Sequence, residues 1–177
     1  MLALTVGLLK FEGRRWYCAG GEWWPWITNV WSKHCSQHPF DPYSLTHISH
    51  GLIFYGILHV VARRLSMSWC LFIALTVAAG WEVLENSAFI INRYREATMS
   101  FDYLGDSVTN SMGDIVACGV GFFAARWLGW RGAIAIFLAT EVALLFLIRD
   151  NLTLNCIMLT HPIPAIKEWQ SAGHIGG

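Results

Sequence analysis

The chain has 177 residues, of which 55% are hydrophobic and only 14% are charged, and its mean hydropathy is +0.43. Its 12 basic and 12 acidic residues balance, so it lacks the net positive charge that attracts nucleic acid. A water-soluble domain of this length could not bury so large an apolar fraction. We therefore predict an all-α integral membrane protein that contacts the lipid bilayer.

The first 43 residues are predicted to lie at the membrane surface. The start, "MLALTVGLLK", is apolar only as far as Lys10, which is too short to cross ~30 Å of hydrocarbon, so we expect a short hydrophobic stub. Residues 20–43 are rich in tryptophan and contain three prolines, which is typical of an interfacial segment without long helices. Cys18 and Cys35 could form a disulfide there if the segment faces an oxidising compartment.

Four longer apolar segments follow, at about 44–62, 68–91, 104–128 and 132–148, each long enough to cross a bilayer as a helix. The short links "RRLSMS" and "GWR" predict tight hairpins, whereas "NRYREATMSFD" predicts a longer polar connection. These features predict one membrane domain over residues 1–177, with a four-span bundle over 44–148 and an interfacial tail over 149–177.

The polar residues of these segments are predicted to gather at one end of the bundle. In an up-down-up-down arrangement, one end receives only the arginines of two hairpins, whereas the other receives His47, His50, Glu82, Glu85, Asn86, Asp106, Asn110, Asp114 and Arg149. This asymmetry predicts a polar pocket that opens to one side of the membrane.

The spacing of these residues supports the pocket. His47 and His50 are three apart, as are Glu82 and Glu85, so each pair shares one face of a helix. Asp114 lies about ten residues into its segment, where an acid costs roughly 3 kcal/mol and normally faces a partner or a wet cavity. Small residues at 113, 117 and 121 continue this stripe and would let another helix pack closely.

Two imidazoles beside several carboxyls are ligand types for a divalent transition metal. The leading hypothesis is metal-dependent hydrolysis or group transfer on a lipid-linked or envelope substrate. Its metal ligands are His47, His50 and Glu82, and its catalytic residues are Glu85 or Asp106 as base, Asp114, and Arg149 as the group that holds an anion.

Two other functions fit the same residues. In one, the polar groups satisfy one another within a non-catalytic accessory or structural subunit, and the tryptophan-rich segment meets a membrane-protein partner. In the other, the carboxylates and histidines form a proton or ion pathway. For Arg93, Arg95 and Arg149, binding an anionic head group and pairing with nearby acids remain open alternatives.

The chain also resembles known proteins. The blocks "SQHPFDPYSLTHISHGLIFYG", "WEVLENSAFIINRYREATMSFDYLGDSVTNSMGD" and "RDNLTLNCIMLTHPIPAIKEWQ" resemble an uncharacterised family of small bacterial inner-membrane proteins, known only as a domain of unknown function. This resemblance implies a location in the bacterial inner membrane and no particular activity. The spacing from His50 through Glu82 and Glu85 to "GDSVTNSMGD" more weakly resembles VanZ-like membrane proteins.

The orientation of the pocket is predicted from the basic hairpins. Arg63 and Arg64 in one hairpin, with Arg126 and Arg131 at the other, favour a cytoplasmic location for that end under the positive-inside rule. More basic residues lie on the pocket side in total, although several of them are site candidates. We therefore predict that the pocket faces the periplasm.

Overall fold

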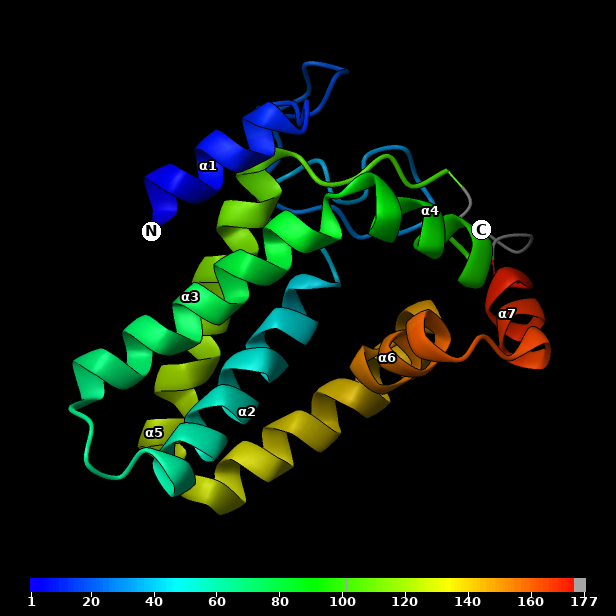
Figure 1. Ribbon diagram of the computed structural model, residues 1–177. Coiled ribbons are helices and arrows are strands. Elements are labelled where there is room, and N and C mark those ends of the chain that lie inside the picture. Colours follow the sequence, from blue (N-terminus) through cyan, green and yellow to red (C-terminus); the bar gives the residue numbers. More distant parts are fainter. Residues whose placement is uncertain (101, 174–177) are drawn as a thin grey trace.

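The computed structural model describes residues 1–100 and 102–173, and the regular structure of these residues is helical. The helices in chain order are α1 (Leu2–Phe11), α2 (Ser44–Val61), α3 (Met67–Glu85), α4 (Ala88–Ala97), α5 (Val108–Ile148), α6 (Leu152–Thr160) and α7 (Pro164–Ser171) (Figure 1). The predicted all-α fold class is confirmed.

Among the described residues, α2, α3 and α5 are long and apolar enough to cross a membrane, by length and composition. Their outward-facing side chains are apolar: Ile57, Phe72, Val120, Phe123 and Phe146 are all exposed. An apolar surface this extensive is consistent with contact between these helices and lipid.

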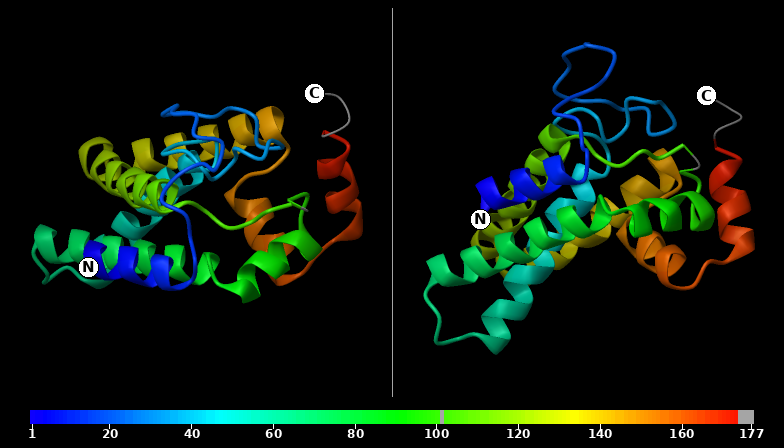
Figure 2. Two further views of the ribbon diagram at one scale, coloured as in Figure 1. Left: turned by 90° about the horizontal axis from the view of Figure 1, so that it is seen from above. Right: turned by 45° about the horizontal axis from the view of Figure 1, so that its top comes forward.

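The third and fourth predicted segments form a single interrupted helix instead of two helices joined by a loop. Helix α5 has 41 residues, and its regular geometry is broken at Gly129, which has φ 66° and ψ 180°. A positive φ is accessible to glycine because it has no Cβ. Figures 1 and 2 show the chain changing direction there and returning toward α6. Among the described residues there are therefore three membrane-length helices, the last of them sharply bent, where four separate helices were predicted.

Helix α3 is shorter than the predicted segment at 68–91. It ends at Glu85, and Ser87 then caps a new helix by accepting a hydrogen bond from the Ile90 amide at 3.4 Å. Helix α4 occupies much of the connection that was predicted to be longer and polar. The capping serine lies inside an apolar run, so hydropathy alone does not reveal the break.

Helices α2 and α5 pack with their backbones unusually close. A Cβ built on Gly51 would lie 2.0 Å from the Cys118 carbonyl oxygen, and one on Gly121 would lie 2.0 Å from the Ile48 carbonyl oxygen. Reciprocal glycines therefore let the two helices approach, as the small-residue stripe predicted. Below this crossing, Phe122 is fully buried and meets the Tyr55 ring edge-on, with ring centroids 5.2 Å apart.

Helix α1 lies along α3, whereas α7 lies near α4 at the other side of the view (Figure 1). Helix α1 has only 10 residues and packs against α3, in agreement with the predicted stub. Residues 12–43 contain no helix, and Trp23, Trp24 and Trp26 are exposed. The tail contains two short helices, α6 and α7, and Asn151 caps α6 by accepting a hydrogen bond from the Leu154 amide at 2.8 Å.

Candidate functional site

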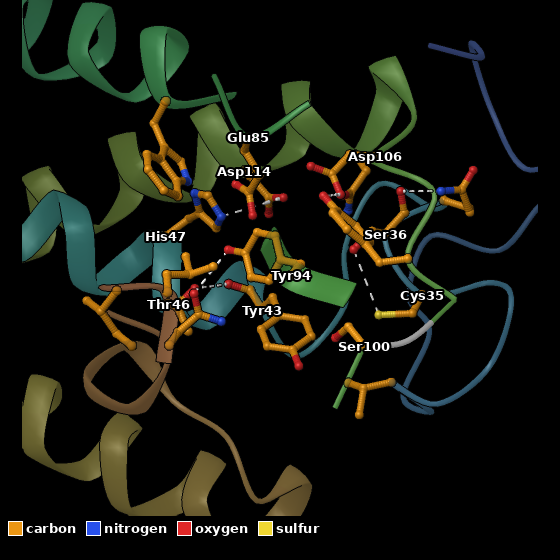
Figure 3. A pocket seen from close by; sticks show the side chains of 18 of the residues that line it. Cys35, Ser36, Tyr43, Thr46, His47, Glu85, Tyr94, Ser100, Asp106 and Asp114 are labelled. Atoms are coloured by element: carbon orange, nitrogen blue, oxygen red, sulfur yellow. Dashed lines mark hydrogen bonds and ion pairs between the residues drawn. The ribbon is translucent and has the colours of Figure 1, made fainter. Parts of the chain in front are cut away.

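A cavity of about 790 Å³ lies where the polar ends of the helices meet the non-helical segments. Figure 3 shows many of its side chains converging on this space. The polar residues that line it include Lys33, Tyr43, Thr46, His47, His50, Glu85, Tyr94, Arg95, Tyr103, Asp106, Asn110, Asp114 and Asn155. The sequence therefore correctly predicted one shared pocket for residues from several helices.

Three helices contribute a buried cluster at the base of this cavity. His47 of α2 lies with its Nδ1 atom 3.4 Å from Glu82 Oε1 of α3 and its Nε2 atom 3.9 Å from Asp114 Oδ2 of α5. Asp114 is held in turn by the Ser44 hydroxyl, which donates to its Oδ1 at 2.7 Å. The histidine is thus placed between two carboxyl groups.

Glu85 joins this cluster. One ligand atom from each of His47, Glu82 and Glu85 lies within 4.8 Å of the others. His47 Nδ1 and both carboxyl oxygens of Glu82 are buried and have no hydrogen-bond partner. Because buried polar atoms are normally satisfied, these three atoms are candidates for binding a further group.

The predicted ligand His50 occupies a different place. Its ring meets the His47 ring edge-on at a centroid distance of 5.1 Å and stacks on Phe54 at 5.9 Å. His50 lines the cavity, but the group of side chains whose ligand atoms lie within 4.8 Å of one another contains Glu85 and not His50. The i, i+3 spacing correctly put both histidines on one face, but it does not determine which of them points toward Glu82.

Asp106 lies on a second wall of the cavity, just before α5 begins. Tyr103 donates its hydroxyl to Asp106 Oδ1 at 2.8 Å, and the Asn86 side chain donates to Oδ2 at 3.2 Å. Burial raises the pKa of Asp106 to about 6, although the hydrogen bond from Tyr103 opposes this rise. A carboxyl with such a pKa can exchange a proton near neutral pH.

A further acid, Asp150, connects the cavity to the tail. Its Oδ2 atom accepts from the Tyr43 hydroxyl at 3.2 Å, and its Oδ1 atom accepts from the Gln170 side chain at 3.0 Å. Burial raises the pKa of Asp150 to about 6. Sequence reasoning missed the contact between Asp150 and Tyr43, because the aromatic hydroxyls carry no periodic signal.

Glu141 and the predicted site residue Arg149 lie outside the cavity lining. Glu141 caps α6, accepting hydrogen bonds from the Leu152 and Thr153 amides at 3.0 Å each. Arg149 follows α5 in the left-handed conformation, donates to the Trp169 carbonyl at 3.0 Å, and stacks over the Trp169 ring. The structure thus does not bring Arg149 to the acids that it was predicted to join.

The cations that line the cavity are Lys33 and Arg95. Arg95 of α4 donates its Nε–H to the Tyr103 carbonyl at 2.6 Å, which fixes its position beside the Asp106 wall. Arg93, also considered from the sequence, instead donates to the Leu159 carbonyl at 2.7 Å and joins α4 to α6. The motif "RYR" supplies one arginine to the cavity and one to helix packing.

Comparisons with known proteins connect this chain to proteins of unestablished activity. A family model described as "Protein of unknown function (DUF2585)" matches residues 9–172. A UPF0314 protein of Sphingopyxis alaskensis is 44% identical over 173 residues, covering 98% of this chain and 92% of that protein. A UPF0314 protein of Brucella anthropi is 45% identical over 171 residues, covering 97% and 87%, respectively.

These matches support the predicted resemblance to an uncharacterised bacterial family. A UPF0314 protein of Paracoccus denitrificans, 43% identical over 172 residues, covers 97% of this chain and has 89% of its own length covered. No solved structure matches the chain at a significant level. The weaker likeness to VanZ-like membrane proteins rests on the sequence pattern alone.

Proposed function

This chain belongs to the DUF2585 family of proteins of unknown function, and we propose that it is a membrane enzyme using a divalent transition metal for hydrolysis or group transfer. The observation that carries the proposal is the group of His47, Glu82 and Glu85, whose ligand atoms lie within 4.8 Å of one another. This group lies at the edge of a cavity large enough for a substrate of several dozen atoms.

The donor set suits a metal of the zinc, iron or manganese type. One imidazole nitrogen and two carboxylates are ligands that such ions accept. A bound divalent cation would also satisfy His47 Nδ1 and the two oxygens of Glu82, which have no hydrogen-bond partner. In such a site the metal supplies Lewis acidity and lowers the pKa of a bound water molecule.

The neighbours of His47 orient it for this role. Since its Nε2 atom faces Asp114 at 3.9 Å, its Nδ1 atom is directed toward Glu82. A carboxylate beside the second nitrogen of a ligating histidine fixes its tautomer and ring position. Ser44 holds that carboxylate by donating to Asp114 Oδ1 at 2.7 Å. We therefore assign Asp114 to positioning His47.

Asp106 is our candidate for the general base. Its pKa of about 6 lets it take a proton from water or a substrate hydroxyl near neutral pH. Arg95 and Lys33 line the same cavity and would attract a phosphate or carboxylate of the substrate. Arg95 takes the anion-binding role that the sequence suggested for Arg149.

The substrate is proposed to be a lipid-linked or envelope molecule. Beside its polar groups, the cavity is lined by the apolar side chains Phe54, Val77, Trp81, Leu152 and Leu159. A charged group at Arg95 and an acyl or isoprenoid chain along these residues would match the two kinds of lining.

We place the protein in the bacterial inner membrane with its cavity toward the periplasm. The two arms of α5 on either side of Gly129 are each about 20 residues long, enough to span ~30 Å of hydrocarbon as helices. Together with α2 and α3 they would make four spans. Arg63, Arg64, Arg126 and Arg131 would then lie at the cytoplasmic end.

The first experiment is elemental analysis of detergent-purified protein dialysed without chelator. We expect the double variant His47→Ala/Glu82→Gln to contain less metal per protein than the natural protein, by a stoichiometric amount. His59→Ala is the matched control, because His59 lies on the same helix and is exposed at its opposite end. Equal metal content in the double variant and the control would overturn the metal assignment.

Activity is tested on the metal-loaded protein with envelope lipid extracts, by mass spectrometry of the released water-soluble groups. We expect Glu85→Gln to lower turnover roughly 10²–10⁴-fold with the helix content unchanged, because it removes a carboxylate at the reacting centre. Glu96→Gln is the control, since Glu96 is exposed on α4. Unchanged turnover in Glu85→Gln would contradict the catalytic role.

The same preparations separate the other two functions. A stoichiometric protein partner without bound metal would favour an accessory subunit. Proton or ion flux in vesicles that is lost in Asp114→Asn would favour a transport pathway.

A further inference from the structure

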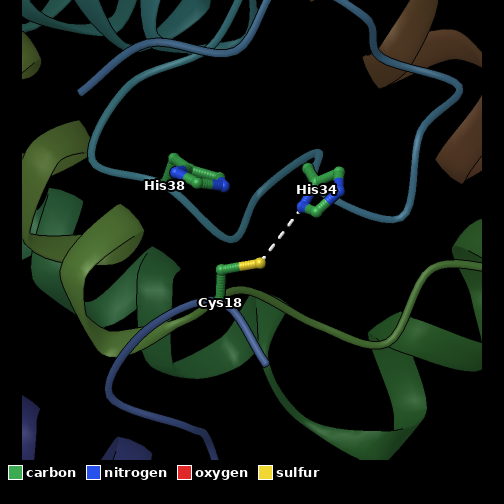
Figure 4. Close-up of side chains that lie close together, drawn as sticks. All are labelled: Cys18, His34 and His38. Carbon is green, nitrogen blue, oxygen red and sulfur yellow. Dashed lines mark hydrogen bonds between the residues drawn. The ribbon is translucent and has the colours of Figure 1, made fainter. Parts of the chain in front are cut away.

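A second group of metal-ligand side chains lies outside the membrane helices, in the non-helical segments. The Cys18 thiol and one ring nitrogen from each of His34 and His38 lie within 4.8 Å of one another. Figure 4 shows these side chains facing a common space. The stretch "HCSQH" has the H-x₃-H spacing of many zinc sites, and Cys18 lies upstream.

The hydrogen bonds of His38 prepare one nitrogen for a metal. His38 Nδ1 lies 2.8 Å from the Trp24 carbonyl oxygen and 2.6 Å from the Tyr17 hydroxyl, so this nitrogen is engaged on the side away from the cluster. The other ring nitrogen, Nε2, is buried without a hydrogen-bond partner in a residue only 1% exposed, and with the proton on Nδ1 it offers its lone pair to a metal. A ligating histidine typically donates its other N–H to a backbone carbonyl in this way.

The other two side chains complete the donor set. Cys18 is 9% exposed, and its Sγ atom lies 3.1 Å from His34 Nδ1. His34 Nε2 faces the Glu22 carboxylate at 3.9 Å, which gives the second histidine a carboxylate partner of its own. The disulfide that the sequence left open is not formed: Cys18 and Cys35 are both free, and Cys35 instead faces Asp41.

We propose that Cys18, His34 and His38 bind Zn²⁺ or a similar transition metal, with water in the fourth position. One sulfur and two imidazole nitrogens favour such an ion over Mg²⁺ or Ca²⁺, which take oxygen ligands. On binding, the Cys18 thiol loses its proton to solvent and the thiolate becomes the ligand. This site is distinct from the His47 group, which contains no sulfur.

The site fixes one wall of the cavity. Cys35, Ser36 and Gln37 lie between the two ligating histidines, and all three line the cavity. The His38 carbonyl also accepts a hydrogen bond from the Asn110 side chain at 2.8 Å, so the metal would tie this segment to the start of α5. The inferred role is structural: the metal holds the cavity wall in place.

Cobalt spectroscopy tests the proposal on the full chain in detergent. We expect Co²⁺-loaded protein to show an intense sulfur-to-cobalt charge-transfer band, which only a thiolate ligand produces. The band should be lost in Cys18→Ser and kept in Cys156→Ser, a control with an exposed cysteine on α6. It should also persist in His47→Ala, so failure of the proposed catalytic site would not affect this result.

Limited proteolysis supplies a second measurement that needs no variant. Because the metal is inferred to hold residues 12–43, removing it from the natural protein with a chelator should accelerate cleavage in this segment, and restoring zinc should reverse the change. Absence of the band in the natural protein, or its persistence in Cys18→Ser, would overturn the proposal. So would a cleavage rate that does not respond to chelation, even if Cys18→Ser fails to fold.

Discussion

The crossing of α2 and α5 predicts a large penalty for adding one methyl group at Gly121. The new Cβ would lie 2.0 Å from the Ile48 carbonyl oxygen, whereas ordinary contact begins at 3.4 Å, a shortfall of about 1.4 Å. The neighbouring atom belongs to the backbone of a packed helix, so relief requires the two helices to separate. Overpacking of this kind destabilises the fold by about 1–3 kcal/mol, whereas the higher helix propensity of alanine stabilises the helix by roughly 1 kcal/mol.

The matched control is Gly119→Ala on the same helix. Its Cβ would meet only the end of the Leu75 side chain, at 3.6 Å, so it gains helix propensity without a clash. We expect Gly121→Ala to unfold more readily than Gly119→Ala by about 2 kcal/mol in denaturant titrations in detergent micelles. Equal stability of the two variants would refute the inferred close contact.

Gly51, the reciprocal glycine on α2, provides a second test of the same helix contact. Gly51→Ala places its Cβ 2.0 Å from the Cys118 carbonyl oxygen at the same crossing. Once the helices have separated for one methyl group, the second meets less resistance, so the double variant should lose less stability than the sum of the two single losses. Strict additivity would contradict this single shared contact.

The remaining predictions concern buried acids. Burial raises the pKa of Asp106 and Asp150 to about 6, so each binds a proton more tightly in the folded than in the unfolded chain. The stability that they contribute is therefore greatest below about pH 4 and is lost as the pH rises through about 6. Denaturant titrations across that range should show this loss weakened in Asp150→Asn, and an unchanged slope would contradict it. Glu141→Gln should cost about 1 kcal/mol, because a neutral amide caps α6 less well than a carboxylate. Faster hydrogen exchange at the Leu152 and Thr153 amides would check this, and unchanged exchange would count against the cap.

The helices could be predicted where one physical signal dominates. Helix α2 begins at Ser44 and ends at Val61, close to the predicted 44–62, because a polar stretch bounds it on each side. The end of α3 was placed too late, since Ser87 caps a new helix inside an apolar run. The bend in α5 replaced a predicted loop because a single glycine with positive φ reverses the chain there.

The candidate site could be predicted where helical periodicity places side chains. Spacings of three and four residues correctly gathered His47, Glu82 and Asp114 on facing helices. The same reasoning could not anticipate that Arg149 turns toward Trp169, because its direction depends on a left-handed residue at the helix end. Nor could it find the group of Cys18, His34 and His38, whose segments follow no regular period.

The hydrogen bond from Gln170 to Asp150 has a consequence for the order in which the protein is completed. Asp150 also holds Tyr43 on the cavity wall, and Gln170 is itself buried near the end of the described chain. During synthesis α7 leaves the ribosome after α1 to α6. The wall at Tyr43 therefore gains the support of Gln170 only after α7 has been translated, so a nascent chain that stalls before α7 carries an unfinished cavity.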